Sequence, residues 1–122
     1  MKRAYRLRRP EQFQRVRREG RNWDSPLLTL NAAQSRRRIT RCGFVVSKRI
    51  GKAVERNRAR RRIREAVRLS YEQIAPGWDL VFIARSSTLT TTEFHRIQAQ
   101  VEQLLRRAGA WREPPPPDVG SE

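Results

Sequence analysis

The densest run of positive charge, in residues 48–68, most narrowly constrains how this chain can fold. Its 21 residues hold ten Lys or Arg side chains and two Glu, a net charge of +8. Apolar and small residues nevertheless recur there at helical spacing, which predicts a helix over about residues 53–74 that lays a narrow stripe on a sheet. Most arginines fall outside this stripe, so we expect a core face and a cationic face. The stripe consists of Val54, Ile63, Ala66, Val67, Ser70, Tyr71 and Ile74.

The composition of the whole chain indicates a polyanionic partner. Its 122 residues include 28 basic and 12 acidic side chains, and 25 of the basic ones are arginines. A guanidinium group stays ionised and presents a planar fork of donors that matches phosphate. Residues 1–85 hold 24 basic and 7 acidic side chains, whereas residues 86–122 hold 4 and 5. One domain is expected at this length, and its first two thirds carry the basic character.

Several classes of protein are excluded by what the sequence lacks. No apolar run approaches the ~20 residues of a membrane span, and the amino terminus lacks the apolar stretch of a secretory signal, so a cytoplasmic location is expected. The single cysteine, Cys42, allows no internal disulfide, and with one histidine, His95, no metal-binding cluster is predicted. We interpret Cys42 as a buried small residue and His95 as a surface or packing residue. No catalytic residue is therefore predicted in the protein.

The remaining elements are predicted from apolar periodicity and from breaks at proline and glycine. A helix is expected over residues 10–18 and strands over 26–30, 39–47 and 78–84. A last helix is expected to begin at a Thr90-x-x-Glu93 capping box and to stop at Gly109. The strand at 78–84 is nearly all apolar, as a central strand covered on both sides would be. We predict one small α/β sandwich domain over residues 1–109 and a proline-rich, disordered tail over residues 110–122.

The most specific motif lies in residues 52–64, which read KAVERNRARRRIR. Arg56, Asn57 and Arg58 open a basic face that further arginines extend over two helical turns of ~5.4 Å each. Such a row can follow a phosphate backbone. The Asn57 amide both donates and accepts hydrogen bonds, so it can contact sugar hydroxyls, a base edge or a hydrated metal ion. The alternative is a solvated helix surface, which gives no reason for so much self-repulsion.

With these residues the chain resembles a known family, the protein subunits of bacterial ribonuclease P. The resemblance covers about residues 3–108 and implies an α+β fold in which a small mixed sheet packs with helices in the order α-β-β-β-α-β-α, as in domain 2 of ribosomal protein S5. It rests on Phe13-x-x-Val16 with Gly20, on Val46-Ser47-Lys48-Arg49-Ile50-Gly51-Lys52-Ala53-Val54-x-Arg56-Asn57-Arg58, on Arg61-x-Ile63-Arg64-Glu65, and on Asp79-Leu80-Val81-Phe82-Ile83-Ala84-Arg85.

The resemblance also implies a function. Ribonuclease P is a ribonucleoprotein endonuclease that removes the 5′ leader of precursor tRNA. In this family the RNA subunit is the catalyst and holds the Mg²⁺ ions that activate water and stabilise the leaving oxygen. The protein would be an accessory subunit, a monomer present once per RNA, that binds RNA and no membrane and assists substrate and magnesium binding.

Two sets of residues would contact RNA if the resemblance holds. A cleft between the first helix and the sheet would hold the single-stranded leader at Phe13, Arg17, Asn31, Val45 and Ser47. The catalytic RNA would lie on a basic face made of Lys48, Arg49, Lys52, Arg56, Asn57, Arg58, Arg60, Arg61, Arg64 and Arg68.

The chain departs from the family pattern in the predicted cleft. A second aromatic residue is common one turn after Phe13, where this chain has Arg17, and another is common near the end of the first strand, at about Asn31. A guanidinium group can stack on a leader base or pair with a leader phosphate. The cleft is therefore expected to be more electrostatic and more sensitive to salt than an aromatic one.

Three other functions compete with this interpretation. A ribosomal or other structural RNA-binding protein is also small and basic. That interpretation does not explain the Arg56–Arg58 segment, and it predicts no effect on leader cleavage. A DNA-binding architectural protein is disfavoured because no turn precedes a separate recognition helix. A self-sufficient nuclease needs grouped carboxylates or histidines, whereas the acidic residues and His95 are scattered along the chain.

Overall fold

A computed structural model describes residues 2–113 of the chain. Three helices and four strands follow one another in the order α-β-β-β-α-β-α, so the predicted α+β fold class is confirmed. Short 3-10 turns lie between some of these elements. The helices are α1 (Pro10–Glu19), α2 (Ala53–Ser70) and α3 (Phe94–Ala108), and the strands are β1 (Arg21–Asp24), β2 (Leu28–Gln34), β3 (Arg41–Val46) and β4 (Trp78–Ala84).

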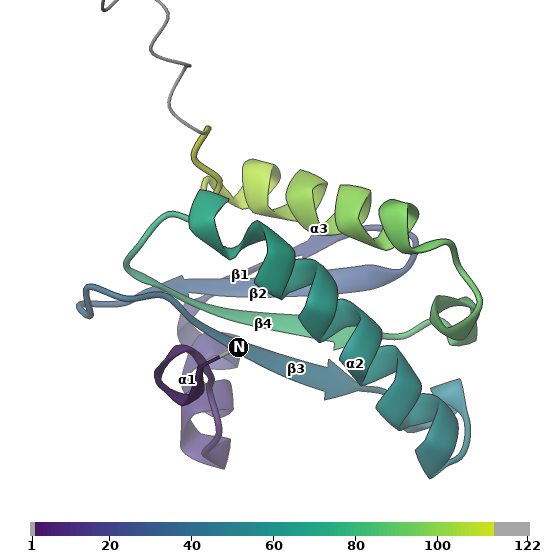
Figure 1. The fold of residues 1–122 in the computed structure, drawn as a ribbon. Helices are drawn as coiled ribbons and strands as arrows, with labels where there is room; N and C mark the ends of the chain where they lie inside the picture. The colour runs from purple at the N-terminus through teal and green to yellow at the C-terminus, as the bar shows by residue number, and fades with distance from the viewer. Residues whose placement is uncertain (1, 114–122) are drawn as a thin grey trace, which may run out of the picture.

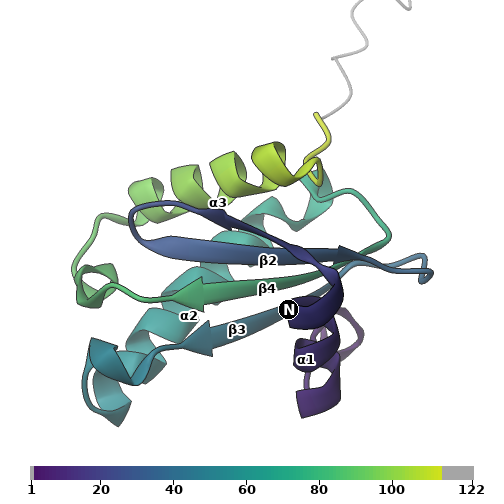
Figure 2. The same ribbon diagram turned by 180° about the vertical axis from the view of Figure 1, so that it is seen from behind.

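The four strands form one mixed sheet in the spatial order β1-β2-β4-β3. β2 pairs antiparallel with β1 and β4, whereas β3 runs parallel to β4. A parallel pair needs a crossover connection, and α2 provides it. α2 and α3 cover one face of the sheet, and α1 crosses the opposite face (Figures 1 and 2). β4 has a neighbour on each edge, which confirms the prediction of a central strand at residues 78–84.

The main core lies between the sheet and the helices α2 and α3. Leu80 and Phe82 of β4 belong to it and are fully buried. Because strand side chains alternate between faces, Val81 and Ile83 belong to the opposite face, where they join a smaller cluster with α1. The smaller cluster leaves part of this face open, since Val45 of β3 is 40% exposed.

The early strands differ from those predicted by periodicity. The strand expected at residues 26–30 begins at Leu28 and continues to Gln34, through the polar Asn31. β1 has the sequence Arg-Asn-Trp-Asp, in which only Trp23 packs against the main core. Such a polar edge strand lacks the apolar alternation that marks a strand in a sequence. Only the family resemblance implied a third strand before the long helix.

Three details of the predicted helices are wrong. Val54 is 75% exposed, because the first turns of α2 project beyond the end of the sheet and Ala59 is the first buried residue of the helix (Figure 1). α2 ends at Ser70 and continues only as a 3-10 turn. Thr90 lies in another 3-10 turn, so it does not cap α3, which begins after Glu93 without a side-chain capping bond. The predicted stop at Gly109 is confirmed.

The packed part of the chain extends past the predicted domain boundary at residue 109. Ala110 is fully buried, and its carbonyl accepts a hydrogen bond of 2.7 Å from the Ala75 N–H. Trp111 pairs with Ile74 in an isolated bridge. Residues 110–113 therefore belong to the domain, whereas residues 114–122 of the predicted tail lie outside the described residues. Among the helices of residues 2–113, none is long and apolar enough to cross a membrane.

Candidate nucleic-acid interface

The turn before α2 determines where the basic face begins. The Ser47 hydroxyl accepts a hydrogen bond from the Arg49 N–H (3.2 Å), and Ile50 is buried. Gly51 then adopts φ +141°, a conformation that a residue with a side chain rarely takes. This turn directs α2 outward, so that residues 52–58 project past the sheet (Figure 1). The most charged part of the chain is thereby presented to solvent.

The ten residues of the predicted basic face all lie on the 3-10 turn before α2, on the residue that joins this turn to α2, or on α2 itself. Each of them is exposed or half-buried, whereas the other side of α2 places Ala59, Ile63, Ala66, Val67 and Ser70 in the core. The exposed members are Lys48, Arg49, Lys52, Asn57, Arg58, Arg61 and Arg68, and the half-buried members are Arg56, Arg60 and Arg64. The helix thus has the two faces that its sequence predicts.

Not every arginine of α2 is available to a partner. The Arg62 guanidinium donates to the carbonyl of Thr90 (3.2 Å) and to that of Thr92, so it holds the segment before α3. Arg68 donates to the Glu65 carboxylate (2.7 Å), which lowers the pKa of Glu65. Much of the remaining charge, from Lys48 to Arg64, has no carboxylate to compensate it within residues 2–113.

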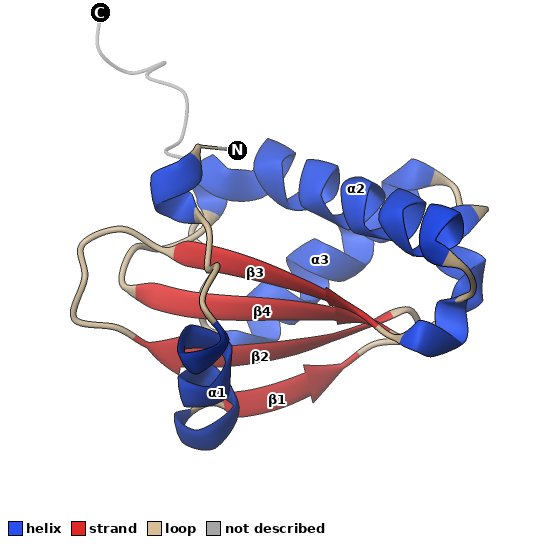
Figure 3. Ribbon diagram, turned by 90° about the horizontal axis from the view of Figure 1, so that it is seen from below, coloured by secondary structure: helices blue, strands red, loops and turns tan. Residues whose placement is uncertain are grey.

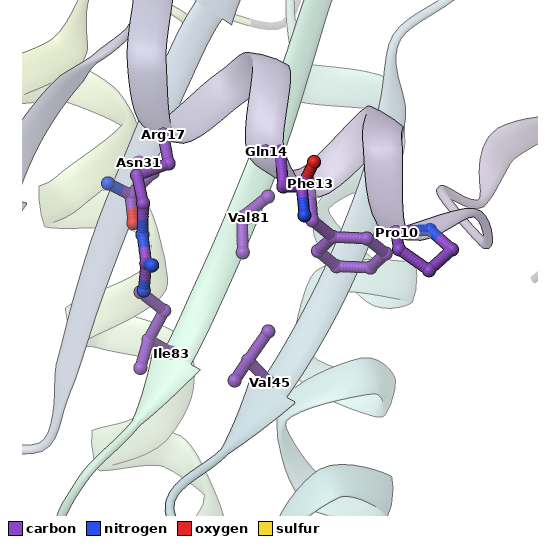
Figure 4. Close-up of a pocket in the computed structure, with 8 residues that line it drawn as sticks. All are labelled: Pro10, Phe13, Gln14, Arg17, Asn31, Val45, Val81 and Ile83. Carbon is purple, nitrogen blue, oxygen red and sulfur yellow. The ribbon is translucent and has the colours of Figure 1, made fainter.

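A groove of about 320 Å³ lies between α1 and the uncovered face of the sheet. Its floor is apolar and comes from the sheet, while α1 forms one wall (Figure 4). Arg17 and Asn31 lie together at one end, and Pro10 and Phe13 lie toward the other (Figure 4). The lining residues are Pro10, Phe13, Gln14, Arg17, Asn31, Val45, Val81 and Ile83.

Four of the five predicted cleft residues therefore line the groove, and Ser47 does not. The Ser47 side chain instead stabilises the turn that precedes α2, because its hydroxyl is used by the Arg49 N–H. Sequence reasoning missed Pro10, Gln14, Val81 and Ile83. The alternation of β4 could have identified the last two, since a central strand with one face in the main core must present its other residues to the opposite face.

A glycine on β3 allows the Phe13 ring to lie against the sheet. A Cβ atom at Gly43 would lie 2.4 Å from Cε1 of Phe13, far inside van der Waals contact. Gly43 and Val45 are two residues apart in β3, so both lie on the groove side of the strand. The absence of a side chain at this position therefore determines how closely α1 approaches the sheet.

A buried ion-pair cluster fastens α1 to the sheet. Asp79 of β4 is 1% exposed and accepts hydrogen bonds from Arg41 of β3 (3.0 and 2.9 Å) and from Arg15 of α1 (2.6 Å). Burial alone would raise the pKa of Asp79, but the hydrogen bonds from Arg41 and Arg15 outweigh it and hold the pKa below its usual value. Asp79 thus stays ionised and serves a structural role.

Within residues 2–113, the single cysteine is buried and the single histidine lies apart from any cluster of metal-binding side chains. Cys42 is fully buried, which raises the pKa of its thiol to about 12 and confirms the interpretation of a packing residue. His95 lies on the surface, 3.3 Å from the Glu93 carboxylate. Within residues 2–113, no group of three or more His, Cys, Asp or Glu side chains could hold a metal ion.

Comparison with known proteins decides the family. A family model described as Ribonuclease P matches residues 1–109. The chain belongs to the ribonuclease P protein family. The ribonuclease P protein component of Roseiflexus castenholzii is 69% identical to it over 109 residues, which are 89% of each chain. That of Chloroflexus aurantiacus is 56% identical over 108 residues, which are 88% of this chain and 80% of the relative.

Solved structures of ribonuclease P proteins have the same fold. The protein from Staphylococcus aureus matches with a TM-score of 0.78 at 28% identity, over 89% of this chain and 99% of that one. The protein from Thermotoga maritima matches with a TM-score of 0.76 at 28% identity, over 84% of this chain and 96% of that one. As a member of the ribonuclease P family, the chain is an RNA-binding protein of tRNA processing whose partner is an RNA subunit.

Proposed function

We propose that this protein binds the ribonuclease P RNA through the basic face and holds the single-stranded 5′ leader of precursor tRNA in the groove. The RNA subunit performs the endonucleolytic cleavage. One protein molecule acts with one RNA, in the cytoplasm where bacterial precursor tRNA is made. The observation that carries this proposal is that two RNA-compatible surfaces, the groove and the basic face, meet where β3 leads into α2.

The two surfaces are continuous through β3. Val45 forms part of the groove floor, and Lys48 opens the basic face three residues later. β3 and β4 end beside the projecting start of α2 (Figure 3). A single-stranded RNA leader that lies in the groove can therefore reach a second RNA bound on α2 without crossing the protein. This arrangement supports a role in bringing leader and catalytic RNA together.

The groove chemistry suits an extended single strand of RNA. Its apolar floor and the Phe13 ring can contact unstacked bases, and base stacking on an aromatic ring contributes about 1–3 kcal/mol. Arg17 supplies a cation for a phosphate or a second plane for a base. Asn31 is less free, because its amide donates to the side-chain carbonyl of Asn22.

Catalysis by the RNA subunit, with Mg²⁺ bound chiefly there, is the second part of the proposal. In such enzymes the metal ions supply an activated water and stabilise the leaving oxygen. The carboxylates and His95 of residues 2–113 do not converge on a metal site, and Asp79 is used by two arginines. The role left to this chain is to neutralise phosphate repulsion between the two RNAs, which assists the binding of substrate and of Mg²⁺ by the RNA.

Reconstitution tests the proposal directly. The protein is combined with a bacterial ribonuclease P RNA at low magnesium, and release of the leader from labelled precursor tRNA is measured. We expect the complex to cleave faster than the RNA alone and the protein alone not to cleave. A lack of stimulation would defeat the proposal, and cleavage by the protein alone would contradict catalysis by the RNA.

Arg17→Ala is expected to weaken binding of leader-bearing precursor tRNA to the complex about tenfold at low salt, because a phosphate contact is lost. The effect should be smaller at high salt, because salt already screens this contact in the wild type. Affinity is measured at two salt concentrations, with Arg18→Ala as the matched control. Arg18 is also exposed on α1 but lies outside the groove. Mature tRNA without a leader should bind both variants like the wild type. Equal leader affinities for Arg17→Ala and the wild type at both salt concentrations would refute the role of Arg17.

A further inference from the structure

A second cluster of arginines surrounds a hollow on the other side of the first turn of α1. Pro10 and Phe13 of this turn line the groove, whereas Arg9 and Gln12 line the hollow. The hollow has a volume of about 480 Å³ and is bounded by the N-terminal segment, α1 and the start of β3. We call it the arginine pocket, after its lining residues Arg3, Arg6, Arg8, Arg9, Arg37 and Arg41.

The arginines of this pocket stand on backbone that is held in place. The N-terminal segment contacts β3 through one isolated bridge, Arg6 with Cys42, before it enters α1 (Figure 3). Leu7 is buried, and its N–H donates to a β3 carbonyl (2.9 Å). The N–H groups of Arg8 and Arg9 both donate to Oε1 of Gln12 (2.9 and 3.0 Å). Cations on a fixed backbone lose less freedom when they bind, which favours a binding site over a loose charged surface.

The protein itself compensates little of this charge. Of the six lining arginines, only Arg41 pairs with a carboxylate within the described chain, the buried Asp79. The loop between β2 and β3 adds the exposed Arg36 and Arg38 close to Arg37 in sequence. Repulsion among these groups destabilises the free protein, so the fold alone gives no reason for their proximity.

We propose that the arginine pocket binds the ribose-phosphate backbone of an RNA segment separate from the leader. The inference rests on the proposed function, in which two RNAs meet on this protein. A guanidinium group can donate two parallel hydrogen bonds to phosphate oxygens, and the five lining arginines other than Arg41, which is used by Asp79, suit successive phosphates of an RNA strand. The pocket lies across α1 from the groove, so its RNA would lie beside the leader and brace α1 from the opposite side. This segment belongs either to the ribonuclease P RNA or to the body of the precursor tRNA, which share the same backbone chemistry.

The test compares two double variants that remove the same charge. Arg8→Gln with Arg37→Gln removes two exposed side chains of the arginine pocket. Arg21→Gln with Arg96→Gln removes two exposed arginines of β1 and α3, outside the pocket and the basic face. We expect the pocket variant to lose about tenfold in RNA affinity at low salt and its salt slope to fall by about 1.5, since each phosphate contact contributes ~0.7–0.9. Equal melting temperatures of the two variants show that both are folded.

Two titrations distinguish the source of the RNA. A loss of affinity for ribonuclease P RNA alone assigns the pocket to the catalytic RNA, and a loss seen only for precursor tRNA added to the assembled complex assigns it to the substrate. Losses no larger than those of the control in both titrations would overturn the inference. That result leaves the proposed function intact when the wild-type complex still cleaves, whereas a wild type that gives no stimulation defeats the proposed function itself.

Discussion

Replacing Arg58 and Arg61 by glutamine is expected to weaken binding of the ribonuclease P RNA about 100-fold at low salt. Both side chains are exposed on α2, and neither pairs with a carboxylate within residues 2–113. A charge-assisted hydrogen bond contributes about 1.5–3 kcal/mol, so two bonds at the lower end of this range account for about two factors of ten. The salt slope of the affinity should also fall by about 1.5, because two phosphate contacts of ~0.7–0.9 each are lost.

The measurement is a titration of the RNA at several salt concentrations, and two controls sharpen it. The double variant Arg21→Gln with Arg96→Gln removes as much charge as the α2 variant does, but from β1 and α3, so it should have little effect on the RNA affinity. Arg68→Gln removes a charge from α2 itself, but that guanidinium already pairs with Glu65. It should therefore lower the RNA affinity less than the single variant Arg58→Gln does. RNA binding that does not respond to salt, or an equal loss in all variants, would contradict the electrostatic role of the basic face.

Asp79→Asn is expected to lower the free energy of unfolding by about 3 kcal/mol near neutral pH, because removing one partner of a buried ion pair leaves the other charge without compensation. Here the carboxylate serves both Arg41 and Arg15, and the variant loses the link between α1 and the sheet. Urea denaturation of the two proteins measures the difference. Glu19→Gln is the control, since it also removes a carboxylate from Arg15 but at an exposed site, where the loss should be below about 1 kcal/mol.

The pH dependence of this difference has a definite sign. The pKa of Asp79 is lower in the folded protein than in the unfolded chain, so the unfolded state binds its proton first as the pH falls. The stabilisation is complete above the usual pKa of aspartate, about 3.9, and is lost as the pH falls toward the lowered folded value. The gap between wild type and Asp79→Asn should therefore narrow in acid. A gap that stays constant with pH would show that the ionised carboxylate is not the source of the stability.

The basic face could be predicted from the sequence because it depends on local properties. A single helix carries nearly all of it, and helical periodicity alone separates the buried Ile63 and Val67 from the exposed Arg58 and Arg61. Periodicity failed at Val54, since it cannot tell where the helix extends past the sheet that should cover it. Periodicity also missed β1, which only the family resemblance implied, because this strand is stabilised by pairing with β2 and not by its own apolar residues.

Much less of the groove than of the basic face could be predicted from the sequence, because the groove is formed by segments that only the tertiary structure brings together. The resemblance named Phe13 and Arg17, but the floor requires Val81 and Ile83, which lie almost 70 residues away in sequence. Its width is determined by Gly43, which admits the Phe13 ring, and by the buried cluster around Asp79. The arginine pocket likewise joins the N-terminal segment to the loop before β3. No periodicity connects such segments, because only chain folding brings them into contact.

The sequence by itself thus determined the cationic helix, the central strand, the last helix and the polyanionic character of the partner, since charge, apolar spacing and glycine or proline breaks act over a few residues. Tertiary structure alone decided how α1 lies on the sheet, which arginines are already paired, and which open surfaces remain for RNA. Those outcomes depend on contacts between distant segments, in which one missing side chain at Gly43 and one buried carboxylate at Asp79 decide the geometry.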